Sequence, residues 1–171
     1  RRPPRSTQSR SSAASDVYKR QVAWSLGMHY FPRMYASWSP TVYWIMGIVT
    51  AIIFFVSVLA HELAHSLVSK ARGVPVDSIT LFIFGGVAHI SDEPKKPGSE
   101  FLMAIAGPIT SIVIGAIFGL IYISAGRSRT PIIAMAGWLS GINMSVGLFN
   151  LIPGFPLDGG RILRAVVWKI T

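Results

Sequence analysis

The chain has 171 residues, of which 51% are hydrophobic and 13% charged, and it contains no cysteine; its mean hydropathy is +0.49. About a quarter of the residues of a soluble domain are charged, so these values argue against that class, and so much apolar side chain excludes a disordered polymer. The formal net charge of +9 does not predict a nucleic-acid partner, because more than half of it lies in residues 1–21 and no groove-reading or base-stacking motif accompanies it. A membrane protein surrounded by the lipid bilayer is therefore expected.

Residues 1–21 are polar and rich in serine, proline and arginine, without a periodic apolar pattern. This composition predicts a disordered tail or a non-native segment. Residues 22–171 are expected to form the folded membrane core, truncated at both ends. The apolar piece 22–31 is too short to cross a bilayer, and the final helical segment stops at residue 171.

Three uncharged apolar stretches predict membrane-spanning helices. The first begins after Ser39 and Pro40, a pair typical of a helix start, and covers residues 41–60. A helix of about 20 residues extends about 30 Å, the thickness of the hydrocarbon core, and the helical pattern continues to a stop at Gly73. The second and third stretches cover residues 101–125 and 131–151.

The remaining segments differ in composition from these stretches. Residues 74–90 hold two short runs of β-branched and aromatic residues separated by a Gly-Gly pair, which predicts a β-hairpin or a small sheet. Gly107 and Pro108, inside the second stretch, are interpreted as a place where helices pack closely. After the third stretch two prolines interrupt the chain, and a helix restarts over residues 161–170. The predicted fold class is an α-helical polytopic membrane protein with partial flanking helices and a small β-hairpin.

The basic residues predict the orientation in the membrane. If the first span starts outside the cytoplasm, seven basic residues beyond the tail face the cytoplasm and three face the other side, as the positive-inside rule prefers. The seven are Lys70, Arg72, Lys95, Lys96, Arg161, Arg164 and Lys169, and the three are Arg33, Arg127 and Arg129. A multi-pass protein of the cell membrane is expected, with the inner end of the first span, and any site there, toward the cytoplasmic side.

His61, Glu62 and His65 follow the first uncharged stretch in the sequence HELAH. Positions i and i+4 share a helix face, so both imidazoles can bind one metal ion, and Glu62 lies beside them to accept a proton from metal-bound water. Ionisable side chains at membrane depth are costly and usually functional. The alternative is an ordinary interfacial helix end with a solvated Glu62. His29 and His89 are isolated and are interpreted as interfacial or hairpin residues.

A catalytic zinc ion requires three protein ligands and an open position for water. Without cysteine, the third ligand must be another histidine or an acidic residue. The acidic residues outside the tail are Glu62, Asp77, Asp92, Glu93, Glu100 and Asp158. Asp158 is the preferred candidate, because prolines and glycines surround it and the third span returns the chain to the side where the histidines lie. Its alternative role is to cap the last helix. A His/His/Asp set favours one zinc ion over harder ions.

Five short motifs are distributed along residues 22–171: HELAH at 61–65, FGG at 84–86, AGP at 106–108, NLIP at 150–153 and LDGG at 157–160. Together they resemble the site-2 protease family of intramembrane zinc metalloproteases, in particular its prokaryotic branch, which often carries CBS domains after the membrane core. The resemblance implies a three-helix catalytic core, in which the two histidines and Asp158 hold zinc and Glu62 is the general base. It also implies that Asn150 lies near the metal and that the strand edge at Gly85 and Gly86 binds unwound substrate.

The expected function is zinc-dependent endoproteolysis of transmembrane protein substrates, as in regulated intramembrane proteolysis. Zinc would polarise the scissile carbonyl, and Glu62 would pass a proton to the leaving amine. Because a membrane helix bonds its carbonyls internally, cleavage requires local unwinding, and the strand edge at residues 81–87 is a candidate to hold the unwound segment. Two alternatives stay open: a non-proteolytic metal-binding or metal-transporting membrane protein, and a membrane binder that captures helices without cutting them. The sequence does not indicate an oligomeric state.

Overall fold

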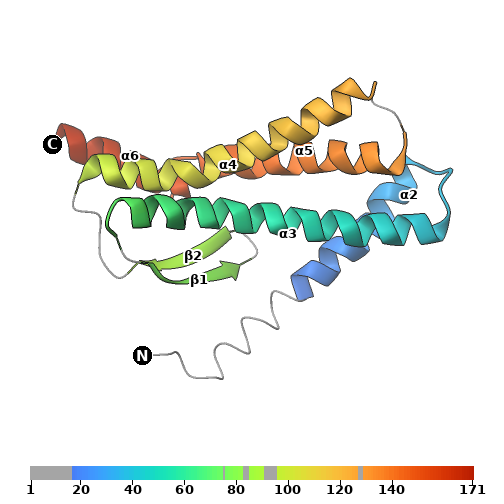
Figure 1. Ribbon diagram of the computed structural model, residues 1–171, viewed down its shortest axis with the longest axis horizontal. Helices are drawn as coiled ribbons and strands as arrows, with labels where there is room; N and C mark the ends of the chain where they lie inside the picture. Colours follow the sequence, from blue (N-terminus) through green and yellow to red (C-terminus); the bar gives the residue numbers. More distant parts are fainter. Residues whose placement is uncertain (1–16, 75, 83–84, 91–95, 127–128) are drawn as a thin grey trace.

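The computed structural model describes residues 17–74, 76–82, 85–90, 96–126 and 129–171. This part of the chain is mainly helical, with one pair of strands (Figure 1). Its elements in chain order are a helix over residues 17–25, a π-helical turn η1 (Leu26–Tyr30), α2 (Phe31–Met34), α3 (Pro40–Ala71), β1 (Val76–Phe82), β2 (Gly85–Ile90), α4 (Pro97–Ser124), α5 (Pro131–Asn150) and α6 (Asp158–Ile170).

Helices α3, α4 and α5 are each long and apolar enough to cross a membrane, which confirms the three predicted spans and the helical membrane class. The predicted start of α3 is also confirmed: Pro40 is its first residue, and the Ser39 side chain accepts a hydrogen bond from the Val42 amide. The helix ends at Ala71, and Gly73 follows with a φ of +75°, a conformation that glycine adopts without steric cost. Because 32 helical residues extend about 48 Å, α3 is longer than the hydrocarbon core is thick.

Helix α4 lies at the centre of the packing. It runs antiparallel to α3 and α5 and contacts both of them as well as α6 (Figure 1). Its approach to α5 is close: a Cβ on Gly115 would lie 2.9 Å from the Met144 amide nitrogen, and one on Gly147 would lie 3.0 Å from the Pro108 carbonyl oxygen. Small residues thus let the two backbones touch, as is common for helices in lipid.

The strands β1 and β2 form an antiparallel two-stranded sheet beside the end of α3 (Figure 1). Phe82 pairs with Gly85 and Val76 with Ile90, with an irregularity in register between Val76 and Ser78. Each strand of a two-stranded sheet has one edge that the sheet itself leaves unpaired.

The N-terminal helix corrects one predicted boundary. Residues 17–21, assigned to the tail, are helical and continue into η1; residues 1–16 of that segment lie outside the described part. The physical reason is the surface of α3, where Gly47 lets the two helices touch: a Cβ there would lie 2.7 Å from the Ala23 carbonyl oxygen. Long basic side chains can cover apolar surface with their methylene stems, which accommodates Lys19 and Arg20 against this helix.

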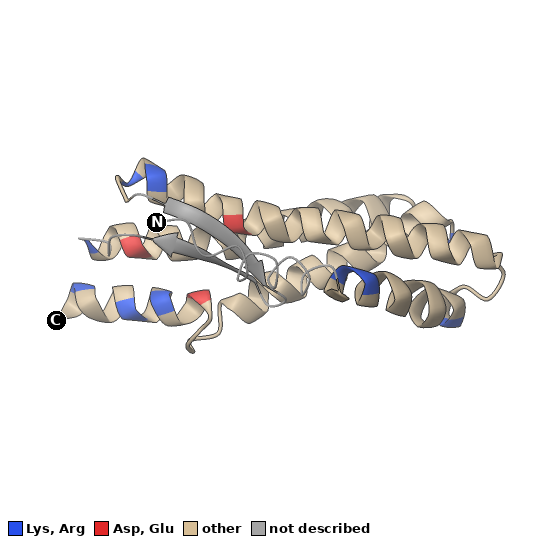
Figure 2. Cartoon of the chain, turned by 90° about the horizontal axis from the view of Figure 1, so that it is seen from below, with Lys and Arg blue, Asp and Glu red and all other residues tan. Residues whose placement is uncertain are grey.

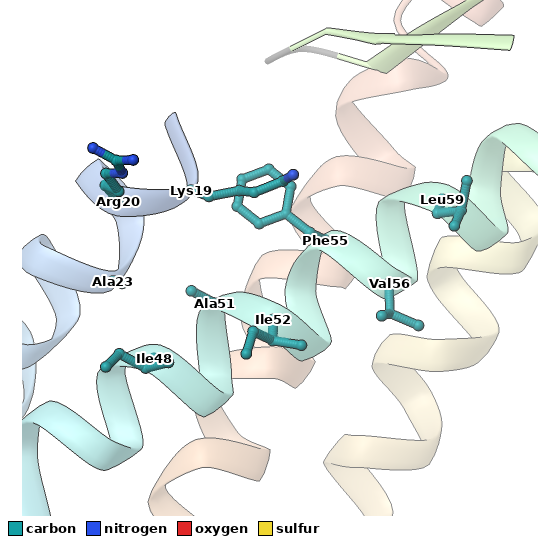
Figure 3. A pocket seen from close by; sticks show the side chains of 9 residues that line it. All are labelled: Lys19, Arg20, Ala23, Ile48, Ala51, Ile52, Phe55, Val56 and Leu59. Carbon is teal, nitrogen blue, oxygen red and sulfur yellow. The ribbon is translucent and has the colours of Figure 1, made fainter. Parts of the chain in front are cut away.

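Beside this contact, a groove of about 520 Å³ lies between the N-terminal helix and the middle of α3 (Figure 3). Apolar side chains of α3 form most of its lining, and Lys19 and Arg20 of the N-terminal helix line the other side. The lining residues are Lys19, Arg20, Ala23, Ile48, Ala51, Ile52, Phe55, Val56 and Leu59. None of the predicted metal ligands lines this groove, so it is separate from the site described next.

Candidate metal centre

Two histidines one turn apart begin the site. His61 and His65 lie on the same face of α3, and only 3% and 7% of their surfaces are exposed. Their Nε2 atoms lie 3.2 Å apart, with the two rings close to perpendicular at an interplanar angle of 76°. The i, i+4 spacing predicted from the sequence therefore brings both imidazoles to one point.

Asp158 reaches this point from the first residue of α6. Its Oδ2 atom lies 3.3 Å from His61 Nε2 and 3.2 Å from His65 Nε2. The residue that caps α6 is Leu157, and no side chain caps the helix, so the alternative role of Asp158 as a helix cap is wrong. The predicted convergence of residues 93 positions apart in the chain is confirmed by the geometry.

The three donor atoms have the spacing of a tetrahedral metal site. Zinc binds nitrogen and oxygen ligands at about 2.0–2.1 Å, which places neighbouring ligand atoms of a tetrahedron about 3.3 Å apart. The observed separations are 3.2, 3.2 and 3.3 Å. Within the described ranges, His61, His65 and Asp158 form the one group of histidine and acidic residues close enough to hold a metal ion. Three ligands leave one tetrahedral position open, as a catalytic zinc site requires.

The outer nitrogens of both imidazoles are held by α4. His65 Nδ1 lies 2.7 Å from the Met103 carbonyl oxygen, and a carbonyl only accepts, so Nδ1 carries the hydrogen and neutral His65 has a free lone pair on Nε2. His61 Nδ1 lies 2.9 Å from Ser111 Oγ. Such partners fix the orientation of metal-binding histidines. The lone pairs that converge at the centre require a proton or a metal ion among them.

Gly107 of α4 faces both imidazoles. A Cβ on this residue would overlap His65 Nε2 and would lie 2.6 Å from His61 Nε2. The backbone of α4 therefore forms one wall of the donor cluster. Close helix packing, the role predicted for Gly107, is correct but incomplete, because the surface against which it packs is the candidate metal site.

The turn before α6 brings Asp158 into place. Two prolines end helical structure after α5, and Gly159 then packs against the chain that precedes it: a Cβ here would overlap the carbonyl oxygens of Leu151 and Ile152. Burial would raise the pKa of the Asp158 carboxyl. When a proton rather than a metal ion occupies the centre, hydrogen bonds donated by the histidine Nε2 atoms outweigh burial and lower this pKa to about 2. The side chain is therefore a carboxylate at neutral pH, the form that binds metal.

The other predicted site residues lie on α3, α5 and β2. Glu62 is buried on α3, with 3% of its surface exposed. Asn150 ends α5, is buried, and donates a hydrogen bond of 3.0 Å to the Val146 carbonyl of its own helix. Gly85 and Gly86 begin β2 and pair with the end of β1. Their predicted contacts with substrate stay predictions.

Among the other acidic residues considered as ligands, Glu100 forms an ion pair with Arg164, and the side chains of Asp77, Asp92 and Glu93 lie outside the described part. His29 packs its ring edge-on against Trp24, at a centroid distance of 4.8 Å, away from the donor cluster. Among the acidic residues whose side chains are described, Asp158 is the one that joins the two histidines in a cluster with metal-ligand spacing.

A fold with three helices long and apolar enough to span a membrane, and a His/His/Asp cluster with metal-ligand spacing, is typical of a membrane metalloprotein. The family model of "Peptidase family M50" matches residues 49–127 and 119–171, and the chain belongs to this family of peptidases, the site-2 proteases. It is 45% identical to Rip3 of Mycobacterium tuberculosis over 148 residues, 85% of this chain and 37% of that protein. It is 42% identical to the zinc metalloprotease MJ0392 of Methanocaldococcus jannaschii over 120 residues, 69% of this chain and 34% of that protein.

A solved structure gives the same fold. The site-2 protease from Methanocaldococcus jannaschii matches 90% of this chain and 64% of its own length, with 37% sequence identity and a TM-score of 0.58. The chain spans little more than a third of the length of the curated relatives that it matches, 37% of Rip3 and 34% of MJ0392.

Proposed function

We propose that the chain is the catalytic core of a zinc endopeptidase that cuts transmembrane protein substrates inside or beside the membrane. The observation that carries the proposal is the tetrahedral spacing of the His61, His65 and Asp158 donor atoms. Family membership supports the proposal, and so does the position of the site beyond an uncharged span. One zinc ion bound there would supply a Lewis acid for the scissile carbonyl and would acidify the attacking water.

The protein side chains have separate tasks in this proposal. The hydrogen bonds to Met103 and Ser111 keep the two imidazoles aimed at the centre. Glu62 follows His61 on α3, is buried, and is the proposed general base that takes a proton from the attacking water and passes it to the leaving amine. Burial excludes bulk water, which strengthens electrostatic interactions around the reacting groups.

The substrate is proposed to be an unwound piece of a membrane helix. A helix exposes no free backbone carbonyl in lipid, so the bond to be cut must first leave the helix. The unpaired edge of β1–β2, including Gly85 and Gly86, is the proposed place where an extended segment adds as a further strand. Asn150 is proposed to hold the substrate backbone near the metal.

The active site is proposed to face the cytoplasm. The lysines and arginines at the end of α3, before α4 and on α6 gather at one end of the molecule, the end where the C-terminus lies (Figure 2). Positive residues favour the cytoplasmic side. We therefore propose a multi-pass protein of the cell membrane, with the donor cluster near the cytoplasmic boundary.

Zinc content and cleavage, measured on the same detergent-purified samples, test the proposed function. The wild type is compared with Glu62→Gln and Asp158→Asn, and the probe is a reconstituted reporter protein with a single membrane helix interrupted by proline. We expect about one zinc per chain in the wild type and in Glu62→Gln, cleavage by the wild type alone, and loss of zinc in Asp158→Asn. Cleavage by Glu62→Gln would contradict the role of the base, and zinc retained in Asp158→Asn would contradict the ligand set. In a separate assay on sealed vesicles, zinc transport by Glu62→Gln, with no cleavage by any variant, would favour a metal transporter.

A further inference from the structure

An ion pair between a buried carboxylate and a half-exposed guanidinium joins α4 to α6 outside the donor cluster. Arg164 Nε donates a hydrogen bond of 2.7 Å to Glu100 Oε1, and Arg164 Nη2 contacts the same oxygen. The Glu100 side chain is 1% exposed, and within the described residues its Oε2 atom has no hydrogen-bond partner. Burying a carboxylate in this way costs desolvation energy, so the pair is weak evidence for stability and calls for another role.

The two partners of this pair lie within two turns, along their own helices, of residues that build the candidate metal site. Glu100 lies one turn of α4 before Met103, whose carbonyl accepts the hydrogen bond from His65. Arg164 lies six residues after Asp158 on α6, about 9 Å along the helix axis. Helix α6 is therefore attached at two levels: Asp158 meets the histidines of α3 at one, and the ion pair joins α6 to α4 at the other.

Helix α6 is not a continuation of α5, so α5 does not fix its position. The residues between α5 and α6 include Pro153, Gly154 and Pro156, and the chain there forms turns rather than a helix. The orientation of α6 depends on its packing against α4. Ala165, directly next to Arg164, is 2% exposed. A ligand carried on the first residue of such a helix needs a second point of attachment further along it.

We propose that Glu100 and Arg164 are a positioning pair, which holds α6 where the Asp158 carboxylate meets the two histidines. The inference rests on the proposed role of Asp158 as a zinc ligand. Without the pair, the histidines keep their places on α3 and their partners on α4, but the third ligand is held only by the turn at Gly159, at one end of α6. Loss of an outer partner of a metal ligand typically weakens metal binding by about 10- to 100-fold.

The test compares two properties of the full chain: zinc affinity, measured by competition with a chelator, and the position of α6 in the metal-free protein. The double variant Glu100→Gln with Arg164→Met removes both charges, so that no unpaired carboxylate is buried. Arg164→Lys keeps the charge without the planar guanidinium. Lys169→Met removes a basic residue from the same helix and serves as the control.

The position of α6 is measured as the distance between spin labels on cysteines introduced at Ile123 and Leu163. Both residues are exposed, one on the far end of α4 and one on α6, and the chain has no cysteine of its own. We expect the double variant to broaden this distance distribution and to bind zinc about 10- to 100-fold more weakly. Arg164→Lys should show smaller changes in both the distance distribution and the zinc affinity than the double variant, and Lys169→Met should match the wild type in both.

An unchanged distance distribution in the double variant would overturn the inference, and so would a broadened distribution with unchanged zinc affinity. A wild-type chain that binds no zinc would instead refute the proposed metal site. The distance distribution would then still decide whether the pair holds α6, because it is measured without metal.

Discussion

The backbone carbonyl of Met103 accepts a hydrogen bond of 2.7 Å from His65 Nδ1. Because the acceptor is a backbone group, α4 orients this imidazole whatever side chain stands at position 103. His61 depends instead on a side chain, the hydroxyl of Ser111. Helix α4 thus orients the two histidines in different ways. A single side-chain substitution on α4 can remove the hydrogen-bond partner of His61 but not that of His65.

Ser111→Ala should therefore weaken zinc binding without unfolding the chain. The alanine removes the partner of His61 Nδ1 and frees the imidazole to rotate, so we expect a loss of about 10- to 100-fold in zinc affinity. Chelator competition measures the effect. Ser145→Ala is the control, because the Ser145 hydroxyl donates its hydrogen bond to the Gly141 carbonyl of its own helix; an equal loss in both variants would show that the effect is not specific to the site.

Gly107→Ala should abolish stoichiometric zinc binding. The new methyl group would occupy the position of His65 Nε2 and come within 2.6 Å of His61 Nε2, so the imidazoles or α4 must move, and overpacking of this kind costs about 1–3 kcal/mol. Zinc per chain is measured on the purified variant. Gly141→Ala, a glycine inside α5 with nothing within 4 Å of its Cβ position, should keep full zinc; full zinc in Gly107→Ala as well would contradict the close approach of α4.

Gly159→Ala should displace Asp158 from the histidines. Its methyl group would overlap the carbonyl oxygens of Leu151 and Ile152, and backbone atoms cannot move aside as a flexible side chain can, so α6 must shift. We expect zinc affinity to fall by at least about 10-fold, measured by chelator competition. Gly154→Ala adds a methyl group in open space in the same turn and should change affinity little. Equal affinities in the two variants would mean that the tight contact at Gly159 does not set the position of the ligand.

Thr50→Val should stabilise the protein. Thr50 is fully buried on α3, and within the described residues its hydroxyl has no hydrogen-bond partner. A buried unsatisfied polar group costs about 1–3 kcal/mol, and valine keeps the shape while removing this cost. Thermal or denaturant unfolding in detergent measures the change.

The control for this prediction is Thr110→Val on α4. The Thr110 hydroxyl donates a hydrogen bond of 2.9 Å to the Ala106 carbonyl, so its removal should bring no comparable gain. A lower unfolding midpoint for Thr50→Val than for the wild type would mean that the Thr50 hydroxyl does have a partner in the folded protein.

Local sequence signals were sufficient for the three long helices and for two of the candidate ligands. Ser39 and Pro40 mark the start of α3 and Gly73 its end, because caps and turns act within a few residues. The histidine pair follows from the helical repeat alone. Asp158 required an argument about topology, since three alternating spans must return the chain to the same side.

Other parts of the site could not be predicted because their signals are not local. Met103 contributes a backbone carbonyl, which no side-chain pattern reveals. Ser111 is one of several small hydroxyl residues in an apolar helix, and Glu100 and Arg164 are 64 residues apart. The helical state of residues 17–21 depends on the neighbouring surface of α3 rather than on their own polar composition.

The distance of 93 residues between His65 and Asp158 also orders events during synthesis of the protein. The histidines enter the membrane with the first of the three long helices, whereas the carboxylate follows only after α4 has turned back and α5 has crossed. A nascent chain that has inserted only part of its helices carries two of the three donors and lacks the set needed for tight binding. The donor set is complete only after α5 has crossed and Asp158 has followed it, so the proposed zinc binding, and any hydrolysis that depends on it, must wait for all three long helices.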